Sequence, residues 1–198
     1  MVIYLKTIKN KIINEIIVNK SKFICILCMV NSKEEVKTII EECKKNYKDA
    51  THYCFAYIID GEMKCFDDGE PSGTAGMPIL NVLKNNKLNH VLCLVIRYFG
   101  GIKLGAGGLV RAYTNSSTKA LEKAEIADLI DGYFIEIEFD YDDVKTIDGI
   151  LKNIEVRKEY NEKIKYSFKI SKVDFDSIDN LINKYAIIIK KEPILICV

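Results

Sequence analysis

The residues whose types and spacing are best suited to binding or catalysis lie in one glycine-rich segment, residues 91–113. An apolar, partly β-branched run reads as an interior strand and is followed by glycines and the start of a helix. The glycines are Gly100, Gly101, Gly105, Gly107 and Gly108. Glycine accepts positive φ and lets other groups approach the backbone, so this spacing predicts a tight turn whose N–H groups could receive an anion. Arg97, Lys103 and Arg111 bracket the turn and add charge suited to phosphate.

The loop does not fit the common nucleotide-binding motifs. Gly100 and Gly105 have Walker A spacing, but Ala106 and Gly107 stand where lysine and serine or threonine are required. A dinucleotide-binding fingerprint would need a further glycine at Val110. The segment therefore predicts general anion binding.

A second cluster places three carboxylates, Asp67, Asp68 and Glu70, within four residues. Their oxygens could hold Mg²⁺. They could equally pair with Arg97 or Arg111, or cap backbone amides in a turn, because Asp-Gly and Glu-Pro mark successive turns here. We favour the turn and ion pairs, with Ser72 or Thr74 capping the helix that follows.

Few other residues are suited to catalysis. His52 and His90 are the two histidines of the sequence. We expect a mainly structural His52 near the start of a strand, with phosphate contact or proton transfer as its alternatives, and an exposed His90. The seven cysteines are expected to be reduced. Cys25 and Cys28 would point to opposite faces of a strand, which argues against a zinc site.

No nucleophile motif occurs in the sequence. We therefore predict no catalytic residue. We also predict no metal and no cofactor, and we favour a binding protein over an enzyme.

The elements that position these residues suggest two domains. In the first we expect strands at residues 2–8, 12–18, 23–30, 50–59 and 91–96, and helices at 32–47, from 79 to the asparagines at 85–86, and up to about residue 127. The first two strands would form a hairpin through residues 9–11. This order predicts an α/β domain covering residues 1–130.

From residue 131 to 198 the pattern is β-α-β-β-α-β, a ferredoxin-like arrangement, with the last strand interrupted near Pro193. The boundary is expected near residues 128–132. This segment has no histidine and one cysteine, so we expect a binding or packing role.

Composition is that of a globular protein. The 198 residues are 48% hydrophobic and 29% charged, with a net charge of +1. No apolar run approaches the ~20 residues that span a bilayer, and the N-terminal residues lack a secretory pattern. We therefore expect no membrane partner, and the cysteines, expected to be reduced and buried, indicate a cytoplasmic protein. The first domain is net positive and the second net negative, a mild bias toward an acidic partner for the first.

Several segments together resemble the YigZ/IMPACT family. They are residues 67–76 with Pro78, residues 97–101, residues 104–113, and the short pieces Ser21–Phe23, Thr51-His52 and Ala56-Tyr57. The resemblance implies an α+β protein. Its N-terminal domain would be an α/β sandwich of the ribosomal-protein and elongation-factor-G domain IV superfold, and its ferredoxin-like tail would be similar to elongation-factor domain V. It also implies a translation-linked or nucleic-acid-binding role.

Three hypotheses follow. In the first, the chain is a translation-associated regulatory protein that binds RNA or a ribosomal or translation-factor surface through His52, Arg97, Lys103, Arg111 and the loop amides. In the second, it is an enzyme in which Mg²⁺ on the acidic cluster acts on a nucleotide or phosphorylated substrate. In the third, the motifs only stabilise the fold and hold no ligand. The oligomeric state is left open.

Overall fold

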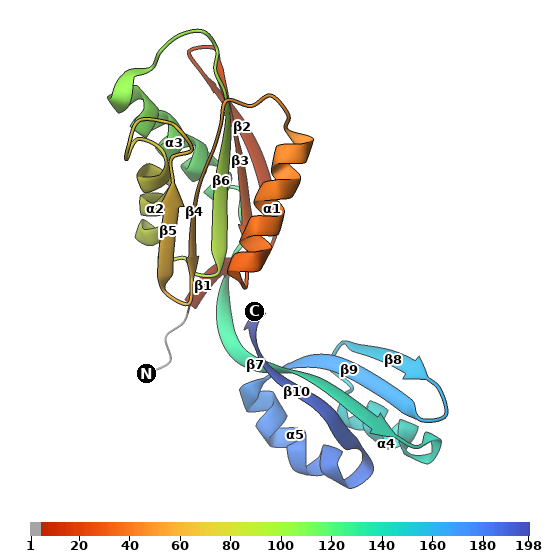
Figure 1. Ribbon diagram of the computed structural model, residues 1–198. Coiled ribbons are helices and arrows are strands. Elements are labelled where there is room, and N and C mark those ends of the chain that lie inside the picture. Colours follow the sequence, from red (N-terminus) through yellow and green to blue (C-terminus); the bar gives the residue numbers. More distant parts are fainter. Residues whose placement is uncertain (1–4) are drawn as a thin grey trace. The chain divides into compact units, whose positions relative to one another are not determined.

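The structure is a computed structural model that describes residues 5–198 (Figure 1). Residues 2–4 of the first expected strand lie outside the described residues. The chain divides into two compact units, one ending at Asp128 and the other covering Leu129–Val198. Both contain sheets and helices, so the protein is a mixed, α+β chain of two units. No helix in residues 5–198 is long and apolar enough to cross a membrane.

The first unit is built on a five-stranded antiparallel sheet with the order β2-β3-β6-β4-β5. Its elements are β1 (Leu5–Ile8), β2 (Ile12–Val18), β3 (Ser21–Met29), α1 (Lys33–Asn46), β4 (His52–Ile59), β5 (Glu62–Phe66), α2 (Gly76–Asn85), β6 (Val91–Tyr98) and α3 (Gly105–Leu121). Strand β7 (Ile126–Phe139) follows and continues into the second unit.

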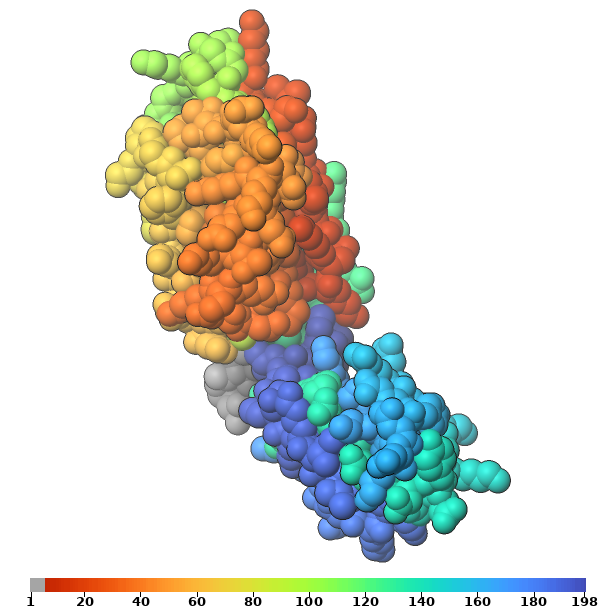
Figure 2. Space-filling model, turned by 45° about the vertical axis from the view of Figure 1, so that its right-hand side comes forward, coloured from red at the N-terminus to blue at the C-terminus, as the bar shows by residue number. Residues whose placement is uncertain are grey.

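Helices cover both faces of this sheet. Helices α2 and α3 pack on one face and α1 on the other, which Figure 2 turns toward the viewer. Strand β3 is apolar on both faces because it contributes to a core on each side. Cys25 joins the α2–α3 core, whereas Cys28 joins the core beneath α1. The expectation that these two thiols diverge is confirmed.

Three sequence-based expectations for this unit are wrong. Strand β1 pairs with β7, not β2, and the hairpin instead joins β2 to β3 through Asn19 and Lys20, both at positive φ. Strand β5 was not expected, although the Asp60-Gly61 turn before it is a hairpin signal. Helix α3 ends at Leu121, well before residue 127.

The second unit has the strand order β10-β7-β9-β8, all antiparallel. Its elements after β7 are a 3-10 turn (Tyr141–Asp143), α4 (Val144–Ile150), β8 (Val156–Tyr160), β9 (Ile164–Ser171), α5 (Lys172–Tyr185) and β10 (Ile187–Cys197). The core gathers Ile135, Ile137, Tyr166, Phe168 and Phe175 between sheet and helices.

The expected break at Pro193 is wrong. Strand β10 runs through Pro193, which lies opposite Tyr133, and the register shifts between Ile188 and Lys190 instead. Proline is tolerated here because β10 ends the strand order, and an edge strand need not donate every backbone hydrogen bond.

Candidate anion-binding site

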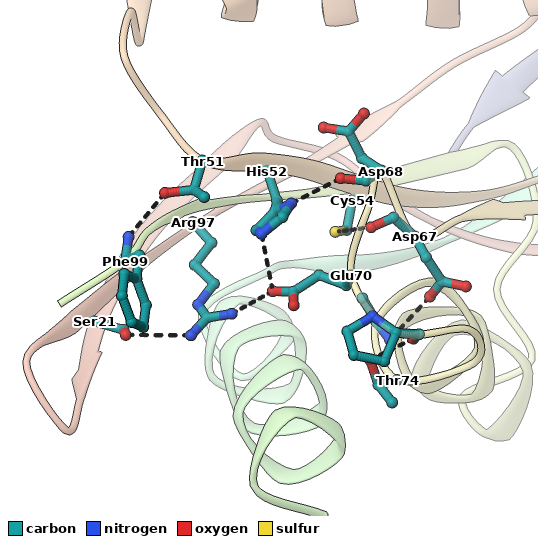
Figure 3. A network of polar contacts seen from close by, with 12 residues as sticks. Ser21, Thr51, His52, Cys54, Asp67, Asp68, Glu70, Thr74, Arg97 and Phe99 are labelled. Carbon is teal, nitrogen blue, oxygen red and sulfur yellow. Dashed lines mark hydrogen bonds and ion pairs between the residues drawn. The ribbon is translucent and has the colours of Figure 1, made fainter. Parts of the chain in front are cut away.

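The site begins where the α2–α3 face of the sheet turns from apolar to polar. Along β6, Val95 belongs to this core, and the next residue on the same face is Arg97. Arg97 lies opposite His52 of β4 and opposite Phe23 of β3. Strand pairing therefore brings an arginine and a histidine together at one end of the sheet, as Figure 3 shows.

Arg97 is buried and incompletely hydrogen-bonded. Its Nη1 donates to Glu70 Oε1 at 2.5 Å, and its Nη2 lies 3.4 Å from Ser21 Oγ. The rings of Phe23 and Phe99 lie 5.4 and 5.6 Å from the guanidinium carbon, measured to their centroids. The residue is only 4% exposed, yet Nε has no acceptor among residues 5–198. A buried donor without a partner is uncommon, so it requires an explanation.

Glu70 accepts one further hydrogen bond, from Tyr113, and lies near His52. Tyr113 Oη donates to Glu70 Oε1 at 2.8 Å, and His52 Nε2 lies 3.9 Å from the same oxygen. His52 Nδ1 lies 2.7 Å from the carbonyl oxygen of Asp68, which can only accept, so Nδ1 carries a proton. Burial raises the pKa of Tyr113 far above its usual value and keeps the hydroxyl protonated as a donor.

Asp67 caps the helix after the acidic turn. Its carboxylate accepts from the N–H groups of Gly73, Ala75 and Gly76 at 2.8–3.0 Å. Partial burial works to raise its pKa, but these three hydrogen bonds outweigh burial and lower it. The expected cap by Ser72 or Thr74 is wrong. The N-cap position is occupied by Ala75, which has no capping side chain, and Thr74 Oγ1 donates to the carbonyl of Pro71.

The other two carboxylates are also engaged. Asp68 Oδ2 accepts from the Tyr53 N–H at 2.6 Å, and Glu70 pairs with Arg97. Within residues 5–198, no group of three or more histidine, cysteine, aspartate or glutamate side chains could hold a metal ion. The carboxylates act here in turn capping and ion pairing.

The glycines of the loop have separate structural roles. Gly100 donates its N–H to Ser21 Oγ, and a Cβ there would lie 2.0 Å from the carbonyl carbon of Lys20. Glycine is required here because the two backbones approach closely. The Gly100 amide is not open to a ligand because it already donates to Ser21. Gly101 and Gly105 have φ values of +85° and +68°. Gly107 and Gly108 lie inside α3.

Helix α3 starts without a side-chain cap. Leu104 occupies the N-cap position, and within the described part of the chain its side chain makes no capping hydrogen bond. The positive end of the helix dipole and its first N–H groups are therefore open to an acceptor.

Two hollows flank Leu104 at this helix start. The first, of about 450 Å³, is lined by His52, Arg97, Lys103 and Gly105, together with Glu70 and Phe99. The second, of about 410 Å³, is lined by Gly108 and Arg111 with Val18, Asn19 and Asn115. The predicted anion-binding residues thus divide between two neighbouring hollows, and Gly100, Gly101 and Gly107 line neither.

Sequence reasoning did not give a site role to several residues of this network. Tyr113 donates to Glu70, Ser21 accepts from Gly100, and Thr51 Oγ1 accepts from the Phe99 N–H at 3.0 Å. All three lie in segments that carry the family resemblance, which was the available signal. No spacing rule connects partners that are 43 to 79 residues apart.

His90 differs from its expected position. Its exposed fraction is 3%, its φ is +54°, and its Nε2 lies 2.9 Å from Asp60 Oδ1. The expectation of an exposed histidine is wrong. His90 precedes β6, whereas Arg97 lies at the other end of that strand, so it takes no part in the site.

Comparison with known proteins identifies the family. Residues 19–121 match the family model of the Impact N-terminal domain. IMPACT family member YvyE of Bacillus subtilis is 50% identical over 118 residues, which cover 58% of this chain and 54% of that protein. The match thus spans about half the length of that relative. A Thermus thermophilus protein, "IMPACT family member in pol 5'region", is 34% identical over 157 residues, which cover 78% of this chain and 86% of that one.

A solved structure supports the fold. A crystal structure described as that of an hypothetical protein aligns over 100% of this chain and 98% of its own with a TM-score of 0.66 and 23% identity. At that identity the likeness concerns the fold alone. On the family model and the relatives, the chain belongs to the IMPACT family.

Proposed function

We propose that this protein is a cytoplasmic, translation-associated regulator whose first unit binds RNA phosphates at the start of α3. Family membership supports the link to translation, as the sequence resemblance implies. We also assign the first unit to the elongation-factor-G domain IV superfold and the second to the ferredoxin-like folds. The observed strand orders support these assignments.

The observation that carries the proposal is the unpaired Nε of Arg97. The Arg97 side chain is 5% exposed, its hydrogen-bond partners among the described residues are one carboxylate and one long contact to a hydroxyl, and it lines a hollow that also contains Lys103. A phosphate oxygen is the acceptor such a donor favours, because charge-assisted hydrogen bonds to phosphate are strong. The uncapped turn of α3 adds further donors at the same hollow.

The second hollow extends the site. Arg111 is exposed, and no ion pair engages it among the described residues. Because Leu104 lines both hollows, Arg97 with Lys103 and Arg111 lie on two sides of one residue. This arrangement suits successive phosphates of an RNA strand better than a single small anion.

The two other hypotheses are less well supported. A magnesium-dependent enzyme would need free carboxylate oxygens, and Asp67, Asp68 and Glu70 are engaged in backbone capping and an ion pair. A purely structural motif accounts for the Arg97–Glu70 pair, but it leaves the Arg97 Nε and the exposed Arg111 without a role. The motif therefore stabilises the fold and also presents donors.

The test is binding of fluorescent ribosomal or transfer RNA fragments from about 50 to 200 mM salt. The double variant Lys103→Gln/Arg111→Gln should bind more weakly, and its log–log salt slope should be shallower by about 0.7 for each lost single-strand contact. The matched control is Lys84→Gln/Lys123→Gln, two exposed lysines that line neither hollow.

Salt-indifferent binding, or equal loss in both double variants, would contradict the proposal. Binding to ribosomal proteins in the absence of any RNA affinity would show instead that the partner is a protein surface.

A further inference from the structure

The other face of the first unit's sheet is only partly covered. Helix α1 packs over β3 and β6 through contacts with Ile24, Ile26, Leu92 and Leu94. Within residues 5–128, α1 is the one helix on this face, whereas α2 and α3 share the opposite face. Of β4, Tyr57 and Ile59 are also buried in the core beneath α1 and Phe55 is partly buried there, so the part of the face that has no helix above it lies toward β5.

A groove of about 400 Å³ follows α1 along this uncovered part. From α1 it is lined by Lys33, Val36, Lys37, Ile40, Glu41 and Lys44, and from the strands by Phe55, Tyr57 and Lys64. The α1 residues recur at intervals of three, four, seven, eight and eleven, so they form one continuous stripe. That stripe spans about three turns, or roughly 16 Å.

The floor of the groove is apolar and its rim is basic. Val36, Ile40, Phe55 and Tyr57 supply the floor, and Phe66, which is 50% exposed, lies 5.7 Å from Phe55 between ring centroids. Figure 2 turns this face forward, with α1 in orange beside the lighter β4–β5 segment.

Four lysines against one glutamate line the rim and walls. Lys33 is paired with Glu62 at 2.7 Å, whereas Lys37 and Lys64 are exposed and have no ion pair within the described part of the chain. The rim therefore carries positive charge that an acidic partner would complement.

We propose that this groove binds an acidic amphipathic helix, about three turns long, from a partner protein. The length and course of the groove beside α1 fit a second helix packed on the sheet. Apolar residues on one side of the helix would cover Val36, Ile40 and Phe55, and glutamates or aspartates at its edges would meet Lys37 and Lys64.

A single-stranded nucleic acid fits these features less well. Bases need exposed aromatic faces on which to stack. Tyr57 is 4% exposed, and the Phe55 and Tyr57 rings lie parallel at 4° with centroids 6.4 Å apart. Phe66, which is 50% exposed, is the one well-exposed ring beside the groove within the described residues, and a single ring cannot stack successive bases, so the apolar floor suits aliphatic side chains better than nucleobases.

The proposal is independent of the RNA site. Lys37 and Phe55 lie on the α1 face, whereas Arg97 and His52 lie at the end of the α2–α3 face. Either site can fail without affecting the other.

The test uses a fluorescein-labelled peptide of about fourteen residues, with leucines at i, i+3, i+4 and i+7 and glutamates elsewhere on the helix. A peptide of the same composition in scrambled order is the matched probe, and a third peptide carries lysines in place of the glutamates. Fluorescence anisotropy gives the affinity for the full chain, and backbone amide NMR shifts locate the bound peptide.

We expect the acidic amphipathic peptide to bind and to shift amide signals of α1, β4 and β5. Lys37→Gln/Lys64→Gln should weaken binding roughly fivefold, as expected for two exposed charge pairs. The control variant Lys45→Gln/Lys48→Gln, two exposed lysines outside the groove, should leave binding unchanged. Both variants keep their fold if their circular dichroism spectra match the wild type.

Several results would overturn the proposal. They are absence of binding at millimolar peptide, equal binding of the scrambled or basic peptide, and equal loss in both double variants. Preferential binding of oligouridylate, sensitive to Lys37→Gln/Lys64→Gln, would assign the groove to nucleic acid and overturn the helix.

Discussion

Arg97 Nη1 and Glu70 Oε1 form an ion pair whose side chains are 5% and 4% exposed. Burying this pair costs free energy because both charged groups lose their hydration, and their mutual attraction offsets only part of that cost. Glu70 gains a hydrogen bond from Tyr113, whereas Arg97 Nε has no acceptor among the residues that the structure describes. The asymmetry separates a stabilising role, carried by Glu70, from a buried donor without an acceptor on a side chain that lines the hollow.

Glu70→Gln should strongly destabilise the first unit. The variant keeps the size of the side chain but leaves a buried guanidinium without a counter-charge, which costs about 3–5 kcal/mol. Urea unfolding measures the free-energy change. The control is Glu125→Gln, whose pair with Lys9 is 3.5 Å long and exposed, and it should cost less than about 1 kcal/mol. Equal effects of the two changes would contradict the structural role given to Glu70.

Gly100 and Gly107 should respond in opposite directions to alanine. At Gly100 a Cβ would meet the Lys20 backbone at 2.0 Å, so the β2–β3 hairpin must shift. The free energy of unfolding of the first unit should fall by about 1–3 kcal/mol. At Gly107, inside α3, the nearest atom is 3.6 Å away, and alanine should stabilise the helix by up to about 1 kcal/mol. Thermal melts check both signs. A neutral Gly100→Ala would refute the close approach of the two backbones.

The cap formed by Asp67 should make stability depend on pH in the acidic range. Because the folded-state pKa of Asp67 is lowered, its carboxylate contributes stability that is fully present above its unfolded pKa of about 4 and is lost as pH falls through the lower folded value. Asp67→Asn keeps one acceptor oxygen but removes the charge, so it should be less stable at pH 7 and lose less stability on acidification. Urea unfolding between about pH 2 and 7 checks this. Parallel curves for the two proteins would exclude Asp67 as the titrating group.

Thiol labelling should distinguish the buried cysteines. Burial raises the pKa of Cys28 and of Cys54 to about 12, so at pH 8 only about one thiol in ten thousand is ionised. Cys65, only partly buried, should react with a disulfide reagent before Cys28 and Cys54, which should react only after unfolding. Mass spectrometry of the labelled peptides identifies each site. Labelling of native Cys54 as fast as Cys65 would contradict its burial.

Local signals in the sequence predicted helix α1 closely. The expected range of residues 32–47 becomes Lys33–Asn46, and Ser32 Oγ accepts from the Glu35 N–H as a capping residue should. The reciprocal bond differs, since the Glu35 carboxylate accepts from the Asn31 N–H. Such contacts join residues three or four apart, which is the distance over which a sequence pattern is informative.

Long-range contacts explain the errors. The partner of β1 is β7, more than a hundred residues later, and the turn between β1 and β2, which by itself favours a hairpin, carries no information on that pairing. His90 is buried against Asp60, 30 residues earlier. The sequence grouped Arg97 and Arg111 around one loop, but it did not predict that the two arginines would have different partners. Arg97 pairs with Glu70 through strand register, and Arg111 stays exposed on α3.

The most direct test of the RNA site is the side-chain Nε–H signal of Arg97 in ¹H–¹⁵N NMR spectra. The chain has three arginines, Arg97, Arg111 and Arg157, so Arg97→Lys assigns the signal. On titration with an RNA fragment, the account predicts that the Arg97 signal shifts saturably and that Arg157, in the second unit, stays unchanged. An Arg97 signal that does not move at saturating RNA would contradict phosphate binding at this hollow.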